Sequence, residues 1–310
     1  MTRATVLIPT FDHGPTLRHS IGSAQQQTVR ELEIFVVGDG PPDVTREIIA
    51  ELSADDPRIR YFDHPKGPRH GEIYRHRALQ EACGEIVCYL ADDDLWLPDH
   101  VERMLEALAS ADFAHSSPAF IHTDGTLHSW PVDLSRPEWP KRIMHAGTGT
   151  ALSTVAHTLD VYRRLPHGWR TTPPDVPTDR FMWLQILGQP GVRAAALHQP
   201  TALTFTSVPR VGWSPERRAA ELEEWAPRVR DPEWRAWFRR QVYTALQESS
   251  VRFFEELWFL KRSPAMRLGS ALLRIPVAGK LLRWVAKARD GRAARAAAEH
   301  PRRAETESRP

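Results

Sequence analysis

The chain has 310 residues, of which 41% are hydrophobic and 26% charged, and its formal net charge is +2. Such a chain can bury a large core, and its composition excludes a disordered or fibrous protein. The two cysteines, Cys83 and Cys88, lack metal-ligand spacing and favour reduced core thiols in a reducing compartment.

Four strand–helix units open the chain. We predict strands at 4–9, 32–37, 58–62 and 85–90, followed by helices near 15–27, 43–54, 72–82 and 98–110, respectively. Continuous apolar strands that alternate with helices indicate a mainly parallel sheet covered on both faces. Polar residues follow these strands, so we expect them to meet at the carboxyl edge of the sheet, where α/β folds bind ligands. No charged-then-apolar leader precedes the first strand, so no secretory signal is predicted.

The ends of the first two strands carry candidate nucleotide-binding residues. The first strand ends in the sequence PTF (9–11) and the second in GDG (38–40). Flanking glycines let the backbone turn sharply and leave the Asp39 carboxylate free. Such a carboxylate can accept the imino N–H of a pyrimidine base, although an ordinary turn aspartate explains the pattern equally well.

A basic segment lies between the third strand and the middle of the following helix. Its six cationic or titratable residues are Lys66, Arg69, His70, Arg75, His76 and Arg77. They suit a diphosphate, or else a solvated start of a helix. Neither a dinucleotide-binding glycine pattern nor a P-loop is present.

Three consecutive aspartates, Asp92, Asp93 and Asp94, follow the fourth strand. Two bare carboxylates about 4 Å apart repel by roughly 4 kcal/mol at an effective dielectric near 20. A cation offsets this repulsion, and oxygen ligands of this kind suit Mg²⁺ or Mn²⁺ shared with substrate phosphates. The alternative is a solvated acidic turn that caps the next helix.

The alternation of strands and helices ends after residue 110. We predict short strands at 112–116 and 119–122 that meet near a turn at 123–126, a strand within 150–158, and a strand pair near 193–206. A proline-rich loop (171–178) leads into a helix at 179–188. Its first residue, Asp179, either compensates the helix dipole or accepts a proton from a substrate hydroxyl as general base.

The C-terminal part is helical and then basic. Two helices are predicted within 215–260. Residues 261–310 carry thirteen Lys/Arg against four Asp/Glu, so the remaining 260 residues have a net charge of −7, which argues against nucleic-acid binding by the body. Charges within the amphipathic segment 264–288 disfavour a membrane span and favour contact with an anionic membrane surface, or packing on the body. Residues 289–310 are predicted to be disordered.

Taken together, these motifs resemble the family 2 glycosyltransferases, which are inverting enzymes with the GT-A fold. The resemblance covers about residues 4–206 and depends on VLIPTF, VVGDG and YRHRALQEACGEIVCYLADDDLWLPDH. It implies an α/β fold of Rossmann-like type with a mainly parallel sheet. The implied domains are a GT-A domain at 1–212, a helical extension at 213–288 and a basic tail at 289–310.

The resemblance also implies roles for individual residues. Base and ribose contacts would come from Pro9, Thr10 and Asp39, and the diphosphate contact from Arg75. Asp92 would bind the sugar nucleotide, while Asp93 and Asp94 would hold a divalent metal ion, Mn²⁺ or Mg²⁺. Asp179 would be the general base. The chain departs from the family pattern at four positions, which are Gly38, His76, Ala91 and Thr178.

The activity implied is transfer of a sugar from a nucleoside-diphosphate sugar to a hydroxyl of a glycan or lipid-linked acceptor, as in polysaccharide biosynthesis. We expect a cytoplasmic protein that associates peripherally with the inner face of the cell membrane. Two alternatives stay open. One is a sugar-nucleotide-binding protein with lost or weak catalysis, consistent with the departures at Gly38, Ala91 and Thr178. The other is a sugar-phosphate nucleotidylyltransferase, which fits less well because FDHGPTLRH replaces the glycine-rich basic loop expected after strand one.

Overall fold

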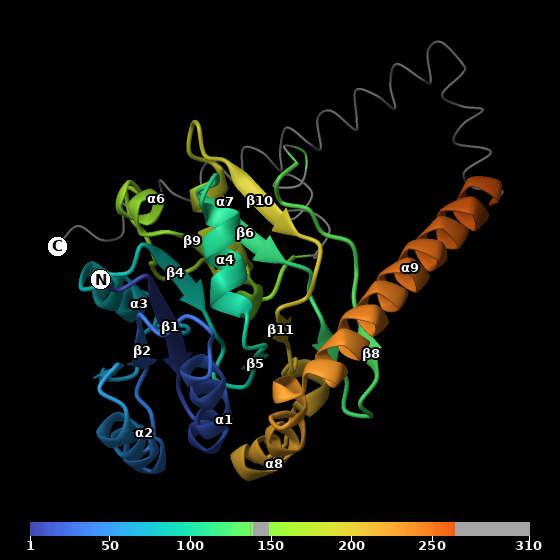
Figure 1. Ribbon diagram of the computed structural model, residues 1–310. Coiled ribbons are helices and arrows are strands. Elements are labelled where there is room, and N and C mark those ends of the chain that lie inside the picture. The colour runs from blue at the N-terminus through green and yellow to red at the C-terminus, as the bar shows by residue number, and fades with distance from the viewer. Residues whose placement is uncertain (137, 139–148, 264–310) are drawn as a thin grey trace. The chain divides into compact units, whose positions relative to one another are not determined.

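The computed structural model describes residues 1–136, 138 and 149–263 (Figure 1). The chain divides into two units, Met1–Ser250 and Val251–Pro310. The first unit contains the sheets and all the residues of the candidate site. The described part of the second unit is helical and ends at residue 263.

The main sheet of the first unit has seven described strands in the order β10-β6-β9-β4-β1-β2-β3. Strand β1 lies between β2 and β4 and is parallel to both, whereas β9 is antiparallel to β4 and β6. The strands of this main sheet are β1 (Ala4–Thr10), β2 (Leu32–Gly38), β3 (Ile59–Phe62), β4 (Ile86–Tyr89), β6 (Phe113–Ser116), β9 (Val155–Thr158) and β10 (Ala194–Leu197). The sheet is therefore mixed but mainly parallel, as predicted.

Helices cover both faces of this sheet. One face packs against α1 (Gly14–Gln25), α2 (Asp43–Asp55) and α4 (His100–Leu108). The other packs against α3 (Glu72–Gln80), α6 (Leu159–Arg163) and α7 (Thr178–Leu187). Because successive side chains of a strand point to opposite faces, β1 sends Val6 and Ile8 to the first core and Leu7 to the second. This explains why the central strands are apolar throughout.

A smaller third core lies beside the main sheet. It joins β5 (Leu95–Trp96) and β11 (Ala202–Leu203), which are antiparallel, to α8 (Pro215–Trp225) and α9 (Pro232–Arg262). A hairpin of β7 (Phe120–Ile121) and β8 (Leu127–His128) contributes Ile121 to it. Ser214 caps α8 by accepting a hydrogen bond from the Arg217 N–H. Helix α8 packs against α1, which brings it to the carboxyl edge of β1.

Two predicted strand pairings differ from the structure. The turn at 123–126 joins β7 to β8, while β6 lies inside the main sheet between β9 and β10. The strands near 193–206 do not pair with each other, because β10 joins β6 and β11 joins β5. Both errors concern partners far apart in sequence, about which local patterns carry no information. The segment predicted to be amphipathic, 264–288, and the tail at 289–310 lie outside the described residues.

Candidate functional site

A cavity of about 260 Å³ opens at the carboxyl edge of β1 and β2. Each of these strands ends there in residues that the sequence analysis singled out, and the segment before α3 closes the opposite side. The lining residues are Pro9, Thr10, Phe11, Val37, Asp39, Lys66, Arg69, His70, Gly71 and Arg75. The structure thus brings together in one cavity Pro9, Thr10, Asp39 and Arg75, the residues that the family resemblance assigns to the donor.

Asp39 is held more tightly than predicted. Its Oδ2 accepts a hydrogen bond from Lys66 Nζ at 2.6 Å, and its Oδ1 accepts one from the Gly67 N–H at 2.7 Å. Gly71, whose φ is +60°, lies so close that a Cβ there would be 2.4 Å from Asp39 Cγ. The carboxylate is therefore not free, but it is fixed in the wall of the cavity. Gly38 is explained by Tyr61, whose hydroxyl would be 2.9 Å from a Cβ at that position.

Arg75 is a buried cation in the wall of the same cavity. Its Nη2 donates to the His70 carbonyl at 3.2 Å, and its guanidinium lies 4.8 Å from the ring centroid of Trp169. Among the described residues its Nε has no hydrogen-bond partner. Burial lowers the pKa of Arg75, while the charges of Glu72, Asp179 and Asp39 act in the opposite direction. A buried, incompletely bonded guanidinium beside a cavity is suited to bind an anion there.

The other basic residues of the 66–77 segment have varied contacts. Lys66 pairs with Asp39, and Arg69 donates to the carbonyls of Pro173 and Val176 at 3.2 and 3.4 Å. His76 hydrogen-bonds the Tyr162 hydroxyl at 2.8 Å. The sequence analysis suggested that the six residues together suit a diphosphate. In the structure they do not form one such cluster. Part of the segment instead links the cavity to the proline-rich loop.

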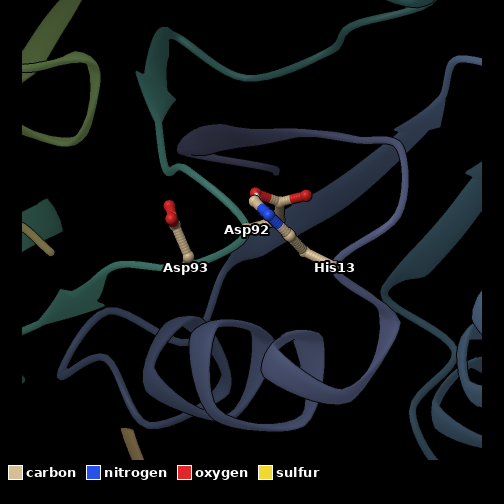
Figure 2. Close-up of side chains that lie close together, drawn as sticks. All are labelled: His13, Asp92 and Asp93. Carbon is tan, nitrogen blue, oxygen red and sulfur yellow. Dashed lines mark hydrogen bonds and ion pairs between the residues drawn. The ribbon is translucent and has the colours of Figure 1, made fainter. Parts of the chain in front are cut away.

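The aspartate run lies in the loop between β4 and β5, beside the residue that precedes α1. His13 Nδ1 is 3.1 Å from Asp92 Oδ1, and Asp93 Oδ2 is 3.2 Å from Arg218 Nη1 of α8. One ligand atom from each of His13, Asp92 and Asp93 lies within 4.8 Å of the others. Figure 2 shows the imidazole of His13 against the carboxylate of Asp92, while Asp93 follows on the same loop as Asp92 with its carboxylate to one side of that pair.

Asp94 differs from its predicted role as a metal ligand. Its Oδ2 accepts a hydrogen bond from Ser153 Oγ at 2.5 Å, and its Oδ1 accepts one from the Phe205 N–H at 2.8 Å. The residue is 2% exposed, and burial raises the pKa of Asp94 well above its ordinary value. Asp94 therefore joins the loop to neighbouring elements. The sequence analysis counted Asp94 among the metal ligands, but in the structure it is His13 that lies with Asp92 and Asp93.

The cluster has the donor set that a hard divalent ion requires. Carboxylate oxygens suit Mg²⁺ and Mn²⁺, and imidazole is compatible with the latter. Burial and the neighbouring charge of Asp92 raise the pKa of Asp93 to about 6, and the hydrogen bond to Asp92 raises the pKa of His13 to about 9. The pKa shift of His13, and the smaller part of the pKa shift of Asp93, come from the negative charge of neighbouring aspartates, which a cation would offset. These residues fit a divalent metal ion.

A second cavity, of about 240 Å³, contains Asp179 at the start of α7. The lining residues are Phe120, Trp130, Gly149, Thr150, Ala151, Pro177, Asp179, Arg180 and Trp183. Asp179 Oδ1 accepts a hydrogen bond from the Arg180 N–H at 2.7 Å, and burial raises the pKa of Asp179. Next to it, Thr178 Oγ1 donates to Oε1 of the buried Glu72 at 3.1 Å. This contact joins the start of α7 to the start of α3.

The sequence analysis missed His13, Glu72 and Arg218. His13 carried a usable signal, because it follows the first strand at the same sheet edge as the aspartates. Glu72 and Arg218 carried none. Their partners, Thr178 and Asp93, are more than 100 residues away in the sequence.

Comparisons with known proteins agree with this geometry. Residues 5–167, just over half of the chain, match the sequence model of the family described as Glycosyl transferase family 2. The chain is 33% identical over 118 residues to GalNAc(5)-diNAcBac-PP-undecaprenol beta-1,3-glucosyltransferase of Campylobacter jejuni, and the match covers 37% of each protein. It is 30% identical over 134 residues to chondroitin synthase of Pasteurella multocida, covering 41% of this chain and 14% of that protein.

The matched region thus spans well under half the length of these two relatives. Among solved structures, residues 1–349 of TarS from S. aureus, in complex with UDP-GlcNAc, superpose with a TM-score of 0.53 at 16% identity. That match covers 66% of this chain and 58% of the TarS chain. At this identity the likeness concerns the fold, and it agrees with the GT-A arrangement predicted from the sequence.

Proposed function

The chain belongs to glycosyl transferase family 2, and we propose that it transfers a sugar from a nucleoside-diphosphate sugar to an acceptor hydroxyl with inversion. The observation that carries this proposal is Arg75, a buried guanidinium with an unpartnered Nε in the wall of the cavity that also contains Asp39. Arginine in such a setting favours the planar, two-pronged recognition of phosphate oxygens. The GT-A neighbour TarS was solved with UDP-GlcNAc, which supports a donor of this class.

In this proposal the first cavity binds the donor. Pro9, Thr10 and Asp39 contact the base and ribose, and Arg75 contacts the diphosphate. Lys66 fixes the Asp39 carboxylate, so the acceptor oxygens of Asp39 are oriented before the nucleotide arrives. This reduces the cost of ordering the site on binding.

Asp92 and Asp93, with His13, would hold a Mn²⁺ or Mg²⁺ ion. When bound, such an ion offsets negative charge on the leaving diphosphate. The positions of these three residues around a common point support this assignment, whereas the bonded state of Asp94 disfavours it as a ligand. The ion is the only cofactor that the proposal requires.

The second cavity would receive the acceptor. Its hydroxyl oxygen attacks the anomeric carbon as the bond from that carbon to the diphosphate oxygen breaks, and the hydroxyl proton passes to the Asp179 carboxylate. A single displacement of this kind inverts the anomeric configuration. Burial raises the pKa of Asp179, which makes its carboxylate a stronger base than that of an ordinary aspartate. Trp130, stacked on Phe120, offers an aromatic wall for a sugar ring.

We further propose that the acceptor is lipid-linked and that the chain works at the inner face of the cell membrane. The Campylobacter jejuni relative is named for a polyprenyl-diphosphate-linked substrate. The last described turns of α9 expose Phe253, Phe254, Trp258 and Phe259, and the basic residues of 261–310 follow them. Aromatic side chains and basic charge together favour an anionic membrane surface. In the described part of the chain, no helix has both the length and the hydropathy needed to cross a bilayer.

The catalytic proposal is tested with Asp179→Asn in the full chain. We expect turnover to fall by about 100-fold or more, the usual effect of removing a general base, while donor binding with Mn²⁺ survives. We also expect turnover to stop in excess chelator. Unchanged turnover in the variant would reject Asp179 as the base. Tight donor binding without turnover in the wild type, across acceptors and metals, would favour the alternative of a binding protein that has lost catalysis.

A further inference from the structure

Arg218 is a buried arginine that the proposed reaction has not used. It lies in α8, which belongs to the third core and not to the main sheet. Its side chain is 10% exposed, and its Nη1 is 3.2 Å from Oδ2 of Asp93. Its Nη2 donates to the carbonyl of Arg210 at 3.2 Å, and Ser207 Oγ lies 3.5 Å from Nη1. The guanidinium is thus held between the aspartate loop and the segment that leads into α8.

The charges of the cluster are balanced within the chain. Asp93 is paired with Arg218, and Asp92 is paired with His13. A guanidinium does not lose its proton in proteins, so the Arg218 charge can leave Asp93 only if the side chain moves. A divalent ion at the His13–Asp92–Asp93 cluster would share the Asp93 carboxylate with this guanidinium. Two cations on one buried carboxylate repel each other strongly, because little water screens them.

We propose that Arg218 is the resident counter-ion of Asp93 and that a divalent metal ion displaces it. Binding of the ion then breaks the Asp93–Arg218 pair and detaches the first turn of α8 from the aspartate loop. The freed guanidinium lies at the edge of the site with two N–H prongs, which suits phosphate oxygens of the donor. This inference rests on the ion-binding part of the proposed function and adds to it an exchange of cations on one carboxylate.

The test measures Mn²⁺ binding to the full chain by electron paramagnetic resonance, without donor or acceptor. Arg218→Gln keeps a side-chain N–H for the Arg210 carbonyl but removes the charge. We expect it to bind Mn²⁺ at least about tenfold more tightly than the wild type, because the competing cation is gone. Arg218→Lys keeps the charge and should stay close to the wild type.

The neighbouring Arg217 provides a matched control on the same helix. It is exposed, and its guanidinium lies 3.8 Å from the ring centroid of Trp213. Arg217→Gln should therefore leave Mn²⁺ affinity unchanged. Equal or weaker affinity in Arg218→Gln would overturn the exchange and leave the proposed metal site intact. No Mn²⁺ binding by either the wild type or Arg218→Gln would overturn the exchange and the metal site together.

A second measurement follows the wild type itself, and a variant serves only to assign one resonance. In ¹⁵N-labelled protein, the Arg218 Nε–Hε resonance is assigned by its absence in Arg218→Lys. Titration with Mg²⁺, which is diamagnetic, should shift this resonance in step with ion binding, whereas that of Arg217 should not move. An Arg218 resonance that stays fixed while Mg²⁺ saturates the site would overturn the displacement.

Discussion

Arg75 and Asp179 carry opposite charges in environments that disfavour both. Burial lowers the pKa of Arg75 and raises the pKa of Asp179, and each charge partly offsets the shift of the other. Among the described residues no ion pair joins them, so the attraction acts across a distance. Each group thus keeps part of its capacity for a ligand, Arg75 for an anion and Asp179 for a proton. Burying these two charges makes the folded state less stable. The proposed function, which needs both groups, explains why the chain keeps them buried.

The raised pKa of Asp179 predicts how the Asp179→Asn variant changes stability with pH. In the folded state the pKa lies above its ordinary value of 3.8, so folding favours the protonated form. The ionised form therefore costs stability as the pH rises through the folded pKa, and the cost vanishes below the unfolded pKa. Asparagine keeps the acceptor for the Arg180 N–H without the charge. We expect Asp179→Asn to melt at a higher temperature than the wild type at pH 8, with the difference shrinking toward pH 4.

Asp124→Asn is a control for which the expected change in stability has the opposite sign. Asp124 is exposed, and hydrogen bonds from Thr126 lower the pKa of Asp124. Its ionised form is favoured in the folded state, so Asp124→Asn should lose a little stability throughout pH 4–8, and the loss should fade only at a pH below the lowered pKa of Asp124. Thermal melts of both variants from pH 4 to 8 give the comparison. A wild type that is more stable than Asp179→Asn at pH 8 would contradict the assigned shift.

At the scale of elements, the start of α3 forms one wall of the donor cavity. Gly71 precedes this helix with φ +60°, and a methyl group there would run into Asp39. We expect Gly71→Ala to weaken binding of nucleoside diphosphates by about tenfold or more, because it displaces the Asp39 carboxylate in addition to straining the backbone by about 1–2 kcal/mol. Calorimetric titration with a panel of nucleoside diphosphates measures the effect.

Gly125→Ala is a control for Gly71→Ala, because it strains the backbone without displacing Asp39. Gly125 has φ +80° at the tip of the β7–β8 hairpin, and a Cβ there would meet no atom within 4 Å. Gly125→Ala should therefore lower the melting temperature without changing nucleotide affinity. If both alanine variants lose affinity equally, the close approach of Gly71 to Asp39 is not what matters.

The elements that the sequence predicted well are those that local patterns define. The first four strands and their helices appear within a few residues of their expected bounds, because each strand is a continuous apolar run and each helix is periodic. The ends of β1 and β2 meet at one edge through parallel pairing, so Thr10 and Asp39 lie in one cavity, as the strand pattern predicted. Arg75 of α3 lines the same cavity, but only the family resemblance had assigned it to the donor.

The parts that the sequence could not predict depend on contacts between distant segments. Strand β9 enters the sheet antiparallel between β4 and β6, which no local pattern indicates. The three aspartates were indistinguishable in sequence, and only Ser153 and the Phe205 N–H separate Asp94 from its neighbours. Lys66 likewise pairs with Asp39 across 27 positions. The residue types at the site were therefore predictable, whereas their pairing was not.

At the scale of the whole molecule, charge is segregated along the chain. Residues 1–260 have a net charge of −7, whereas residues 261–310 have +9. An acidic body is repelled by an anionic surface, and a basic end is attracted to it within about a Debye length, 10 Å at 0.1 M salt. Such a chain should approach a membrane by its basic end. The attraction alone is sensitive to salt, so stable contact requires apolar residues next to the charges.

The exposed aromatic residues before residue 261 are such apolar residues. Replacing them should therefore weaken membrane binding. Trp258 and Phe259 are exposed near the end of α9, with Arg262 packed on Trp258 at 3.7 Å from its ring centroid. We expect the full chain to sediment with vesicles of mixed phosphatidylglycerol and phosphatidylcholine but not with phosphatidylcholine alone. Replacing Trp258 and Phe259 by serine should weaken this binding several-fold, since two apolar anchors are lost while every basic residue is kept.

Trp237 is the matched control, because it is an exposed tryptophan of the same helix but lies 21 positions before Trp258, and so farther along the chain from the basic residues of 261–310. Trp237→Ser should bind vesicles as the wild type does. If all three proteins sediment equally, the aromatic residues of α9 are not anchors. If none binds even at low salt, the basic end does not act at membranes, and a lipid-linked acceptor would have to be recognised through its sugar alone. In that case the catalytic proposal would still stand, because donor binding and proton transfer depend on residues of the first unit.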